Sequence, residues 1–165
     1  MTNRDVANKF FEDRNGRFER GSMSVSYSDN IYYSYSTAIG KIVKDINGNN
    51  VLIVSNDCFS MTTTKHIHEL IEAGCKHGLK IYYLPQEMYR GDFYLSWIVD
   101  IIKGNLEFFS KEKLTRKNNR EGVEGHYSML INLLMLEDFK PYFKEIKKIL
   151  KKYESVYEYV KNYKK

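Results

Sequence analysis

The sequence predicts an α+β fold: an N-terminal antiparallel β-meander with a helix, followed by a helical half that ends in a long amphipathic helix. In the first half, turn signals rich in Asn, Asp and Gly separate short runs of β-branched and aromatic residues. In the second half, apolar residues recur at helical spacing. The composition changes near residue 86, which predicts a β-rich subdomain over about 1–85 and a helical subdomain over about 86–165. Because 165 residues fit one domain, we expect both parts to form a single domain.

The first elements along the chain are short. Residues 4–12 place their apolar side chains on one side of a short helix. Two edge strands are predicted next, at Arg17–Arg20 and at Met23–Tyr27, and the second has apolar residues at every other position. Ile31–Ser36 is rich in residues that suit a pleated sheet, and the extended pattern continues through Ala38–Lys44.

The clearest hairpin signal is the Asn- and Gly-rich run Asp45–Asn50. Val51–Ser55 after it is almost wholly apolar, which predicts a central strand. Gly40, inside the strand before the hairpin, indicates a bulge or a close backbone approach. Together these runs predict an antiparallel meander of about four or five strands.

A helix is predicted after the meander. The consecutive threonines Thr62–Thr64 are candidate N-cap residues, because a threonine hydroxyl accepts a hydrogen bond from one of the first free N–H groups. Apolar residues at helical spacing continue toward Gly78, a natural helix stop. Lys80–Leu84 then predicts one further strand, closed by Pro85.

Four segments make up the helical half. Phe93–Phe109 predicts an amphipathic helix, Lys111–Gly125 a polar, exposed loop, and His126–Leu136 a strongly apolar, buried helix. The last segment carries apolar residues seven positions apart, at Phe139, Ile146, Tyr153 and Val160. This heptad pattern is typical of a long helix packed on another helix, or of a coiled coil. We favour packing within the chain and hence a monomer, with a dimer through this helix as the alternative.

The net charge and the cysteines limit the class of protein. A net charge of +5 and a pI near 9.0 favour anionic partners such as nucleic acid, and they exclude a strongly acidic mimic of DNA. Cys58 and Cys75 form no C-x-x-C pair, as in reduced intracellular proteins. No apolar run reaches the length of about 18 residues that a membrane span needs, and the N-terminus lacks the apolar core of a signal peptide. We therefore expect a cytoplasmic protein with no membrane partner.

Basic residues are the strongest chemical signal. Five of them fall within ten residues of the predicted loop: Lys111, Lys113, Arg116, Lys117 and Arg120. Such a cluster can neutralise phosphate groups. Glutamates lie between these residues, so the alternative is a charged loop that only faces water. The lysines of the last helix allow the same two interpretations, since a helix must present polar residues to solvent.

The sequence predicts no metal site, no cofactor and no enzymatic activity. His66 and His68 are two positions apart on one helix and point to different faces. His66 and His77 would lie about 16 Å apart along the helix axis, too far for one zinc ion. Phosphate-binding glycine loops and nucleophile motifs are absent from the sequence. The carboxylates show no spacing that marks an acid–base couple or the metal site of a nuclease.

Tyr35–Gly40 reads Y-S-T-A-I-G, and after the hairpin Ser60–His66 reads S-M-T-T-T-K-H into a helix. These two motifs resemble a small-protein family that is common in bacteriophages. The family pattern is roughly Y-x-T-x-I-A, a hairpin, then y-S-x-T-T-x-x-H. Here Gly40 stands where the pattern often has alanine and Phe59 where it often has tyrosine, and the resemblance covers residues 17–75. The resemblance assigns no activity and no catalytic residues, and it implies a phage or a mobile element as the context.

That context favours a non-enzymatic protein that binds and inhibits a host defence nuclease, as anti-CRISPR proteins do with Cas effectors. The expected partner is a host protein in the bacterial cytoplasm, such as a Cas nuclease or its guide-RNA complex. The alternative is a nucleic-acid-binding accessory or regulatory protein. The candidate binding residues are the five basic residues of the predicted loop, together with Lys65 and His66 at the end of the second motif.

Overall fold

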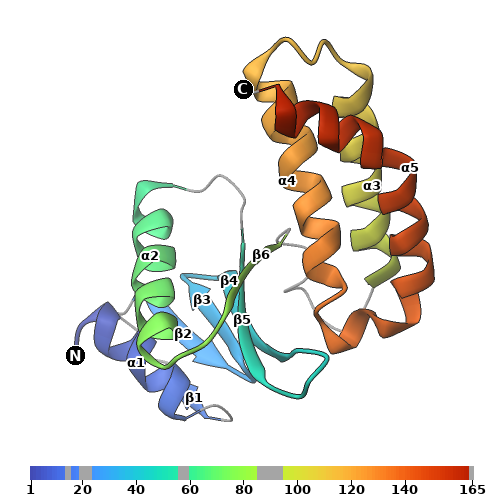
Figure 1. Ribbon diagram of the computed structural model, residues 1–165. Coiled ribbons are helices and arrows are strands. Elements are labelled where there is room, and N and C mark those ends of the chain that lie inside the picture. The colour runs from blue at the N-terminus through green and yellow to red at the C-terminus, as the bar shows by residue number, and fades with distance from the viewer. Residues whose placement is uncertain (14–15, 19–23, 56–59, 85–94, 164–165) are drawn as a thin grey trace. The chain divides into compact units, whose positions relative to one another are not determined.

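The computed structural model describes residues 1–13, 16–18, 24–55, 60–84 and 95–163 (Figure 1). The chain divides into two compact units, Met1–Gly91 and Asp92–Lys165. A sheet with helices comes first and helices alone follow, which confirms the predicted α+β fold class. The division lies close to the predicted composition step at residue 86, and the expectation of a single domain stays a prediction. None of the described helices is long and apolar enough to cross a membrane.

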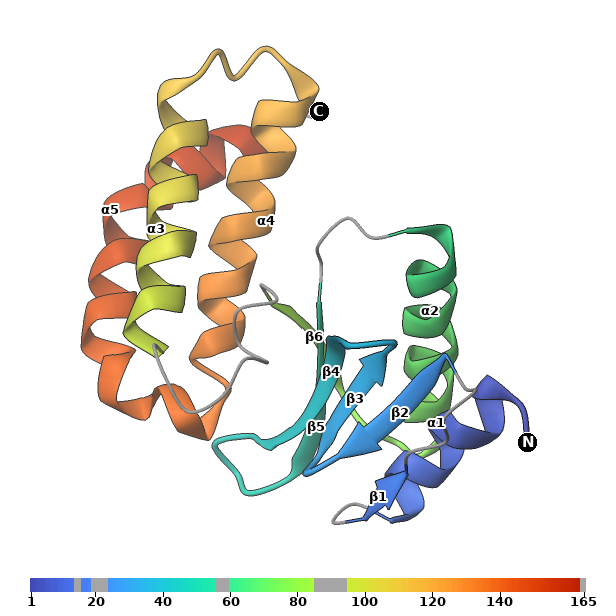
Figure 2. The same cartoon turned by 180° about the vertical axis from the view of Figure 1, so that it is seen from behind.

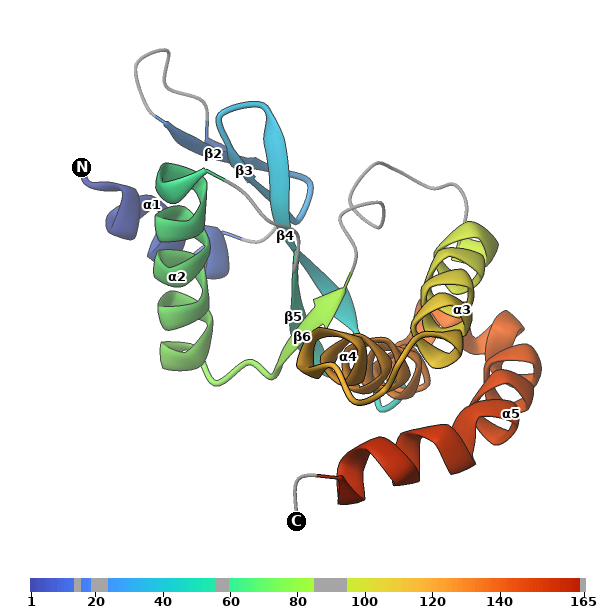
Figure 3. The same ribbon diagram turned by 90° about the horizontal axis from the view of Figure 1, so that it is seen from above.

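The first unit is a six-stranded sheet with two helices on one face (Figures 1 and 3). The strands are neighbours in chain order: β1 to β5 pair antiparallel, as the predicted meander requires, and β6 pairs parallel with β5. The elements are α1 (Asn3–Glu12), β1 (Arg17–Phe18), β2 (Val25–Ser28), β3 (Ile31–Ser34), β4 (Thr37–Lys44), β5 (Asn50–Ser55), α2 (Met61–Lys76) and β6 (Ile81–Leu84).

The core of this unit lies between the two helices and the sheet. Phe10 of α1 packs against the rings of Tyr27 and Tyr32, with ring centroids 5.5 and 5.4 Å apart, and all three side chains are buried. Leu70 of α2 is also fully buried in this core. Each such side chain contributes about 1.5–3 kcal/mol when it leaves water. Every residue from Val51 to Ser55 is buried, and β5 lies between β4 and β6, so the predicted central strand is an interior strand, one position from the edge of the sheet.

The hairpin between β4 and β5 forms where the sequence predicts it. The Asp45 carboxylate accepts hydrogen bonds from the backbone N–H groups of Asn47 and Asn49, both at 2.8 Å. Gly48 has a φ of +81°, a conformation that glycine adopts without strain. The bulge expected at Gly40 is confirmed, because the pairing register shifts beside it. The atom that approaches Gly40 most closely belongs to a side chain and not to the backbone: a Cβ atom there would collide with Leu70 of α2.

One strand prediction is wrong. The extended pattern was expected to continue from Ile31–Ser36 into Ala38–Lys44, but the chain reverses at Tyr35 and Ser36. Ser34 of β3 pairs with Thr37 of β4, so the turn has only two residues. Tyr35 takes a φ of +54°, which is unusual for a residue other than Gly, Asn or Asp. The turn therefore lacks the residue types that mark a hairpin in a sequence.

The N-cap prediction for α2 is also wrong, whereas its end is confirmed. Ser60 is the N-cap, and its hydroxyl accepts a hydrogen bond from the backbone N–H of Thr63 at 3.3 Å. The helix therefore begins at Met61, before the threonines that were expected to cap it. Gly78 follows the helix with a φ of +73°, as expected of a helix stop.

The second unit consists of three α-helices side by side and a short 3₁₀ helix (Figure 2). Its elements are α3 (Leu95–Lys111), α4 (Lys117–Leu133), η2 (Glu137–Tyr142) and α5 (Phe143–Asn162). The predicted loop Lys111–Gly125 is wrong, because α4 already begins at Lys117. The loop was predicted because the segment is polar and charged, but from Lys117 onward these polar residues form an exposed side of α4, and Gly122 has a packing role. A Cβ atom there would collide with the ring of Phe109 on α3.

The heptad pattern of the last segment is confirmed. Phe139, Ile146, Tyr153 and Val160 are all buried, and α5 contacts α4 and α3 of the same chain. The rings of Tyr127 on α4 and Tyr157 on α5 stack with centroids 4.0 Å apart. The expected choice of a monomer over a dimer stays a prediction.

Candidate functional site

The five basic residues predicted to form a cluster do not remain available together. Lys111 Nζ lies 2.7 Å from Glu107 Oε1, and Lys117 Nζ lies 3.6 Å from Glu121 Oε1. The hydrogen bond between Glu107 and Lys111 raises the pKa of the lysine and lowers the pKa of the glutamate. Two of the five cations therefore have an intrahelical carboxylate partner.

Arg120 stabilises the turn between α3 and α4. Its Nη1 donates to the carbonyl oxygens of Leu114 and Thr115, at 2.9 and 2.7 Å. Its guanidinium also lies 4.2 Å from the ring centroid of Tyr163, within the range of a cation–π contact. Lys113 and Arg116 are the two predicted residues that stay exposed and make no ion pair or side-chain hydrogen bond within the described part of the chain.

Lys65 and His66 are neighbours in sequence but lie in different environments. Lys65 is exposed on α2, whereas the His66 side chain is only 2% exposed. His66 contacts side chains of this same chain, so a direct binding role for it would require these contacts to open.

The contacts of His66 link four elements of the first unit. Its Nδ1 lies 2.7 Å from the Ser34 hydroxyl at the end of β3. Its Nε2 lies 3.1 Å from Asn3 Nδ2 at the start of α1 and 3.3 Å from the Ser24 hydroxyl just before β2. The Ser34 hydroxyl also donates to Thr63 Oγ1 at 3.2 Å, one turn earlier on α2. We call these five residues the His66 cluster.

The hydrogen-bond partners of His66 show which of its two ring nitrogens carries the proton. The amide nitrogen of Asn3 can only donate, so Nε2 of His66 accepts and carries no proton. The neutral ring then has its proton on Nδ1 and donates to Ser34. Burial lowers the pKa of His66, and Lys65 adds to this effect, while Glu69 opposes it. The cluster therefore holds a neutral histidine that ties α2 to α1 and to the sheet.

His66 brings together the two motifs noted in the sequence, Tyr35–Gly40 and Ser60–His66. Ser60 and Thr63 belong to the second motif and His66 ends it, while the ring of Tyr35 from the first motif lies 5.9 Å from the His66 ring. The sequence reasoning identified these residues but did not foresee that they meet. It also missed Asn3 and Ser24, whose only signal is that they are small polar residues.

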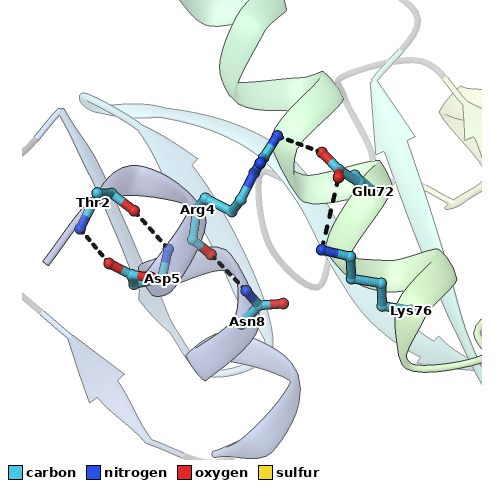
Figure 4. A network of polar contacts seen from close by, with 6 residues as sticks. All are labelled: Thr2, Arg4, Asp5, Asn8, Glu72 and Lys76. Atoms are coloured by element: carbon cyan, nitrogen blue, oxygen red, sulfur yellow. Dashed lines mark hydrogen bonds and ion pairs between the residues drawn. The ribbon is translucent and has the colours of Figure 1, made fainter.

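A groove of about 480 Å³ lies along the exposed side of α2. Its wall consists of Arg4 from α1 and six residues of α2: Met61, Thr64, Lys65, His68, Glu69 and Glu72. Glu72 accepts from Arg4 at 2.7 Å and lies 3.7 Å from Lys76, as Figure 4 shows. The charges on this wall largely compensate one another. Within the described ranges, no group of three His, Cys, Asp or Glu residues is placed to hold a metal ion.

A dense group of exposed lysines lies on α5. Five of them, here called the lysine face, fall within nine residues: Lys144, Lys147, Lys148, Lys151 and Lys152. Glu145 is the one acidic residue in that stretch, and within the described residues none of these lysines forms an ion pair. The hydrogen bond from Lys111 lowers the pKa of Glu107 on α3, and the charge of Lys152 helps to lower it. The second unit carries 15 basic and 11 acidic residues, a net charge of +4, while the first carries 11 and 10, a net charge of +1.

Comparison with known proteins gives a family for the first unit. The model of a family of unknown function (DUF8033) matches residues 3–87, just over half of the chain. No curated protein and no solved structure matches the chain. The matched range includes the whole stretch 17–75 of the resemblance noted in the sequence, and the phage context itself stays a prediction. The chain therefore belongs to the family of unknown function DUF8033.

Proposed function

We propose that this protein binds nucleic acid through the lysine face of α5 and catalyses no reaction on it. One observation carries the proposal: five exposed lysines lie within nine residues of a single helix, with one glutamate among them, and none of the five forms an ion pair within the described residues. The apolar side of the same helix is buried, since Ile146, Ile149 and Tyr153 pack into the unit. The helix therefore holds its lysines outward on a fixed support.

The spacing of the lysines suits a chain of phosphates. Lys144 and Lys152 are eight residues apart, which is about 12 Å along the axis at 1.5 Å per residue. Duplex DNA presents one negative charge for about every 1.7 Å of its axis, so a segment of this length offers more phosphates than there are lysines. Each lysine that neutralises a phosphate releases bound counterions, and the affinity then falls with salt.

The test is a binding titration with labelled single-stranded and double-stranded oligonucleotides between 50 and 200 mM salt. The variant Lys144→Gln, Lys148→Gln, Lys151→Gln removes three charges from the lysine face and keeps residues that favour helix. We expect it to bind more weakly and to reduce the slope of log affinity against log salt by about two to three units.

The matched control removes the same charge from the first unit, in the variant Lys44→Gln, Lys76→Gln, Lys80→Gln. These lysines are also exposed, so both variants change the net charge equally. If only the total charge mattered, the two variants would weaken binding to the same extent, and the proposal would be wrong. A wild-type protein that binds no oligonucleotide at 50 mM salt would contradict it as well.

The turn between α3 and α4 is tested separately. Lys113→Gln with Arg116→Gln changes the two predicted residues that remain available. Unchanged affinity in this variant would restrict the interface to α5, whereas a parallel loss would extend it to the turn.

Inhibition of a host defence nuclease, such as a Cas effector, is the second candidate function. The resemblance to a phage protein family favours it, and the lysine face would suit the guide RNA of such a complex. Target cleavage by the effector should then stop at a stoichiometric amount of this protein. Cleavage that continues unchanged in a panel of effectors at excess protein would argue against this function.

A further inference from the structure

We infer that the nucleic acid bound by α5 is single-stranded, and that Tyr159 is the side chain on which an unpaired base stacks. This inference rests on the proposed function and adds the class of nucleic acid. The observation behind it is an exposed aromatic residue that continues the row of lysines along the same helix.

The geometry follows from the helix period. Residues three or four apart lie in one row along a helix, and one such row of α5 consists of Lys144, Lys148, Lys151, Ser155 and Tyr159. The row thus begins with cations and ends with a ring. Lys152 and Tyr159 are seven residues apart, two helical turns or about 10 Å. A strand whose phosphates follow the lysines would bring its next bases to the tyrosine.

The ring of Tyr159 is exposed and lies beside the ring of Tyr163. Its side chain is 51% exposed, and its ring centroid lies 5.9 Å from that of Tyr163, which is 43% exposed. The guanidinium of Arg120 lies 4.2 Å from the Tyr163 ring centroid, so Tyr163 contacts the first turn of α4. About half of the Tyr159 side chain is accessible to solvent and available for stacking.

The side chains of this row favour single-stranded nucleic acid over a duplex. The bases of a duplex are stacked on one another and offer no free face, whereas proteins that bind single strands combine a positive surface with exposed aromatic rings. Lysine, serine and tyrosine side chains supply charge, a hydroxyl and a ring, and the row has no arginine or glutamine for bidentate reading of base edges. Binding should therefore depend little on base sequence, and the DNA and RNA forms should bind with similar affinity.

The experiment compares the full-length wild-type protein with Tyr159→Ala and Tyr159→Phe. The probes are labelled single strands of about 15 nucleotides, dT and U, and a DNA duplex of the same length, at 50 mM salt. We expect Tyr159→Ala to lose about fivefold to 100-fold in affinity for both single strands and less than about twofold for the duplex. Tyr159→Phe should retain the wild-type affinity, because stacking needs the ring and not the hydroxyl.

The control is Phe108→Ala, which removes an exposed ring of the same unit that is not on the row. It should leave the affinity for single strands unchanged. The inference is overturned if Tyr159→Ala binds single strands as wild type does, if it loses single-strand and duplex binding equally, or if wild type prefers the duplex. These results would leave the proposed function intact if binding still required the lysines of α5. The proposed function is wrong if the wild-type protein binds no probe, or if the lysine-face variant weakens binding no more than the control variant does.

Discussion

The hydroxyl of Ser34 lies 2.7 Å from Nδ1 of His66, and both side chains are buried. This polar contact joins the end of β3 to the first turns of α2, where Thr63, Asn3 and Ser24 complete a small polar cluster beside the apolar core. Because the neighbouring Nε2 accepts from Asn3, the same histidine also holds the start of α1. One ring thus links both helices to the sheet.

Ser34→Ala should destabilise the first unit. The change leaves a buried N–H of His66 without its acceptor, and an unsatisfied buried polar group typically destabilises a protein by about 1–3 kcal/mol. Urea unfolding measures the loss. Ser36→Ala is the control, since Ser36 is exposed in the adjacent turn and should change the free energy of unfolding by less than about 0.5 kcal/mol. Equal losses in the two variants would show that the contact is not stabilising.

The free energy of unfolding should fall when the pH drops below about 6.5, the ordinary pKa of histidine. Burial lowers the pKa of folded His66, so the unfolded chain binds more protons than the folded chain between the lowered pKa and 6.5. The contribution of His66 to the free energy of unfolding is fully present above about pH 6.5 and is lost as the pH falls from there through the lowered pKa. Urea titrations from pH 7.5 to pH 5 measure the slope. His66→Gln should reduce it, and His68→Gln, at an exposed position, should keep it.

Gly40→Ala should destabilise the protein, whereas Gly104→Ala should stabilise it. A Cβ atom at Gly40 would collide with Leu70 in the core, and overpacking of this kind usually destabilises by about 1–3 kcal/mol. A Cβ atom at Gly104 would meet nothing, and replacing a helical glycine by alanine gains about 0.5–1 kcal/mol. Thermal unfolding of the two variants should therefore shift in opposite directions. A shared direction would contradict the packing described for β4 and α2.

Arg120→Ala should destabilise the second unit. The change removes two hydrogen bonds from a charged donor to backbone carbonyls, and such bonds contribute about 1.5–3 kcal/mol each when well shielded from water. Arg120 is only half-buried, so we expect a total loss of about 1–3 kcal/mol. Guanidinium chloride unfolding gives the value. The comparison is Arg116→Ala, whose exposed side chain makes no capping bond and should have little effect.

The sequence predicted those parts of the fold that repeat a local pattern. The heptads from Phe139 to Val160 and the run Asp45–Asn50 carry their own signals, and the structure has both as expected. The turn at Tyr35 was missed because its residue types do not mark a turn, and the partner that stabilises it is distant: the Tyr35 N–H donates to the Ser24 carbonyl. The start of α4 was missed because residues 111–125 are mostly polar and charged, and the packing of Gly122 against Phe109 depends on α3.

The sequence alone could predict which residue types make up the candidate site, but not which of these residues remain available for binding. The sequence showed clusters of basic residues, but the partners of each cation depend on helix register. Lys111 and Lys117 meet glutamates four residues away, and Arg120 turns back to two carbonyl groups. On α5, Glu145 lies among the five lysines and Glu154 and Glu158 follow them, but within the described residues none of these glutamates forms an ion pair with the lysines. The His66 cluster depends on contacts between residues up to 63 positions apart, which no local pattern contains.

The strand order of the sheet implies an order of assembly. β1 to β5 are joined by short connections, so each can pair with the strand made just before it, as fast local hairpins do. β6 lies beside β5 in the same direction and is separated from it by the whole of α2. During synthesis, the meander can therefore form while α2 is still emerging, and the sheet is completed only when that helix has docked and brought Ile81–Leu84 back to β5.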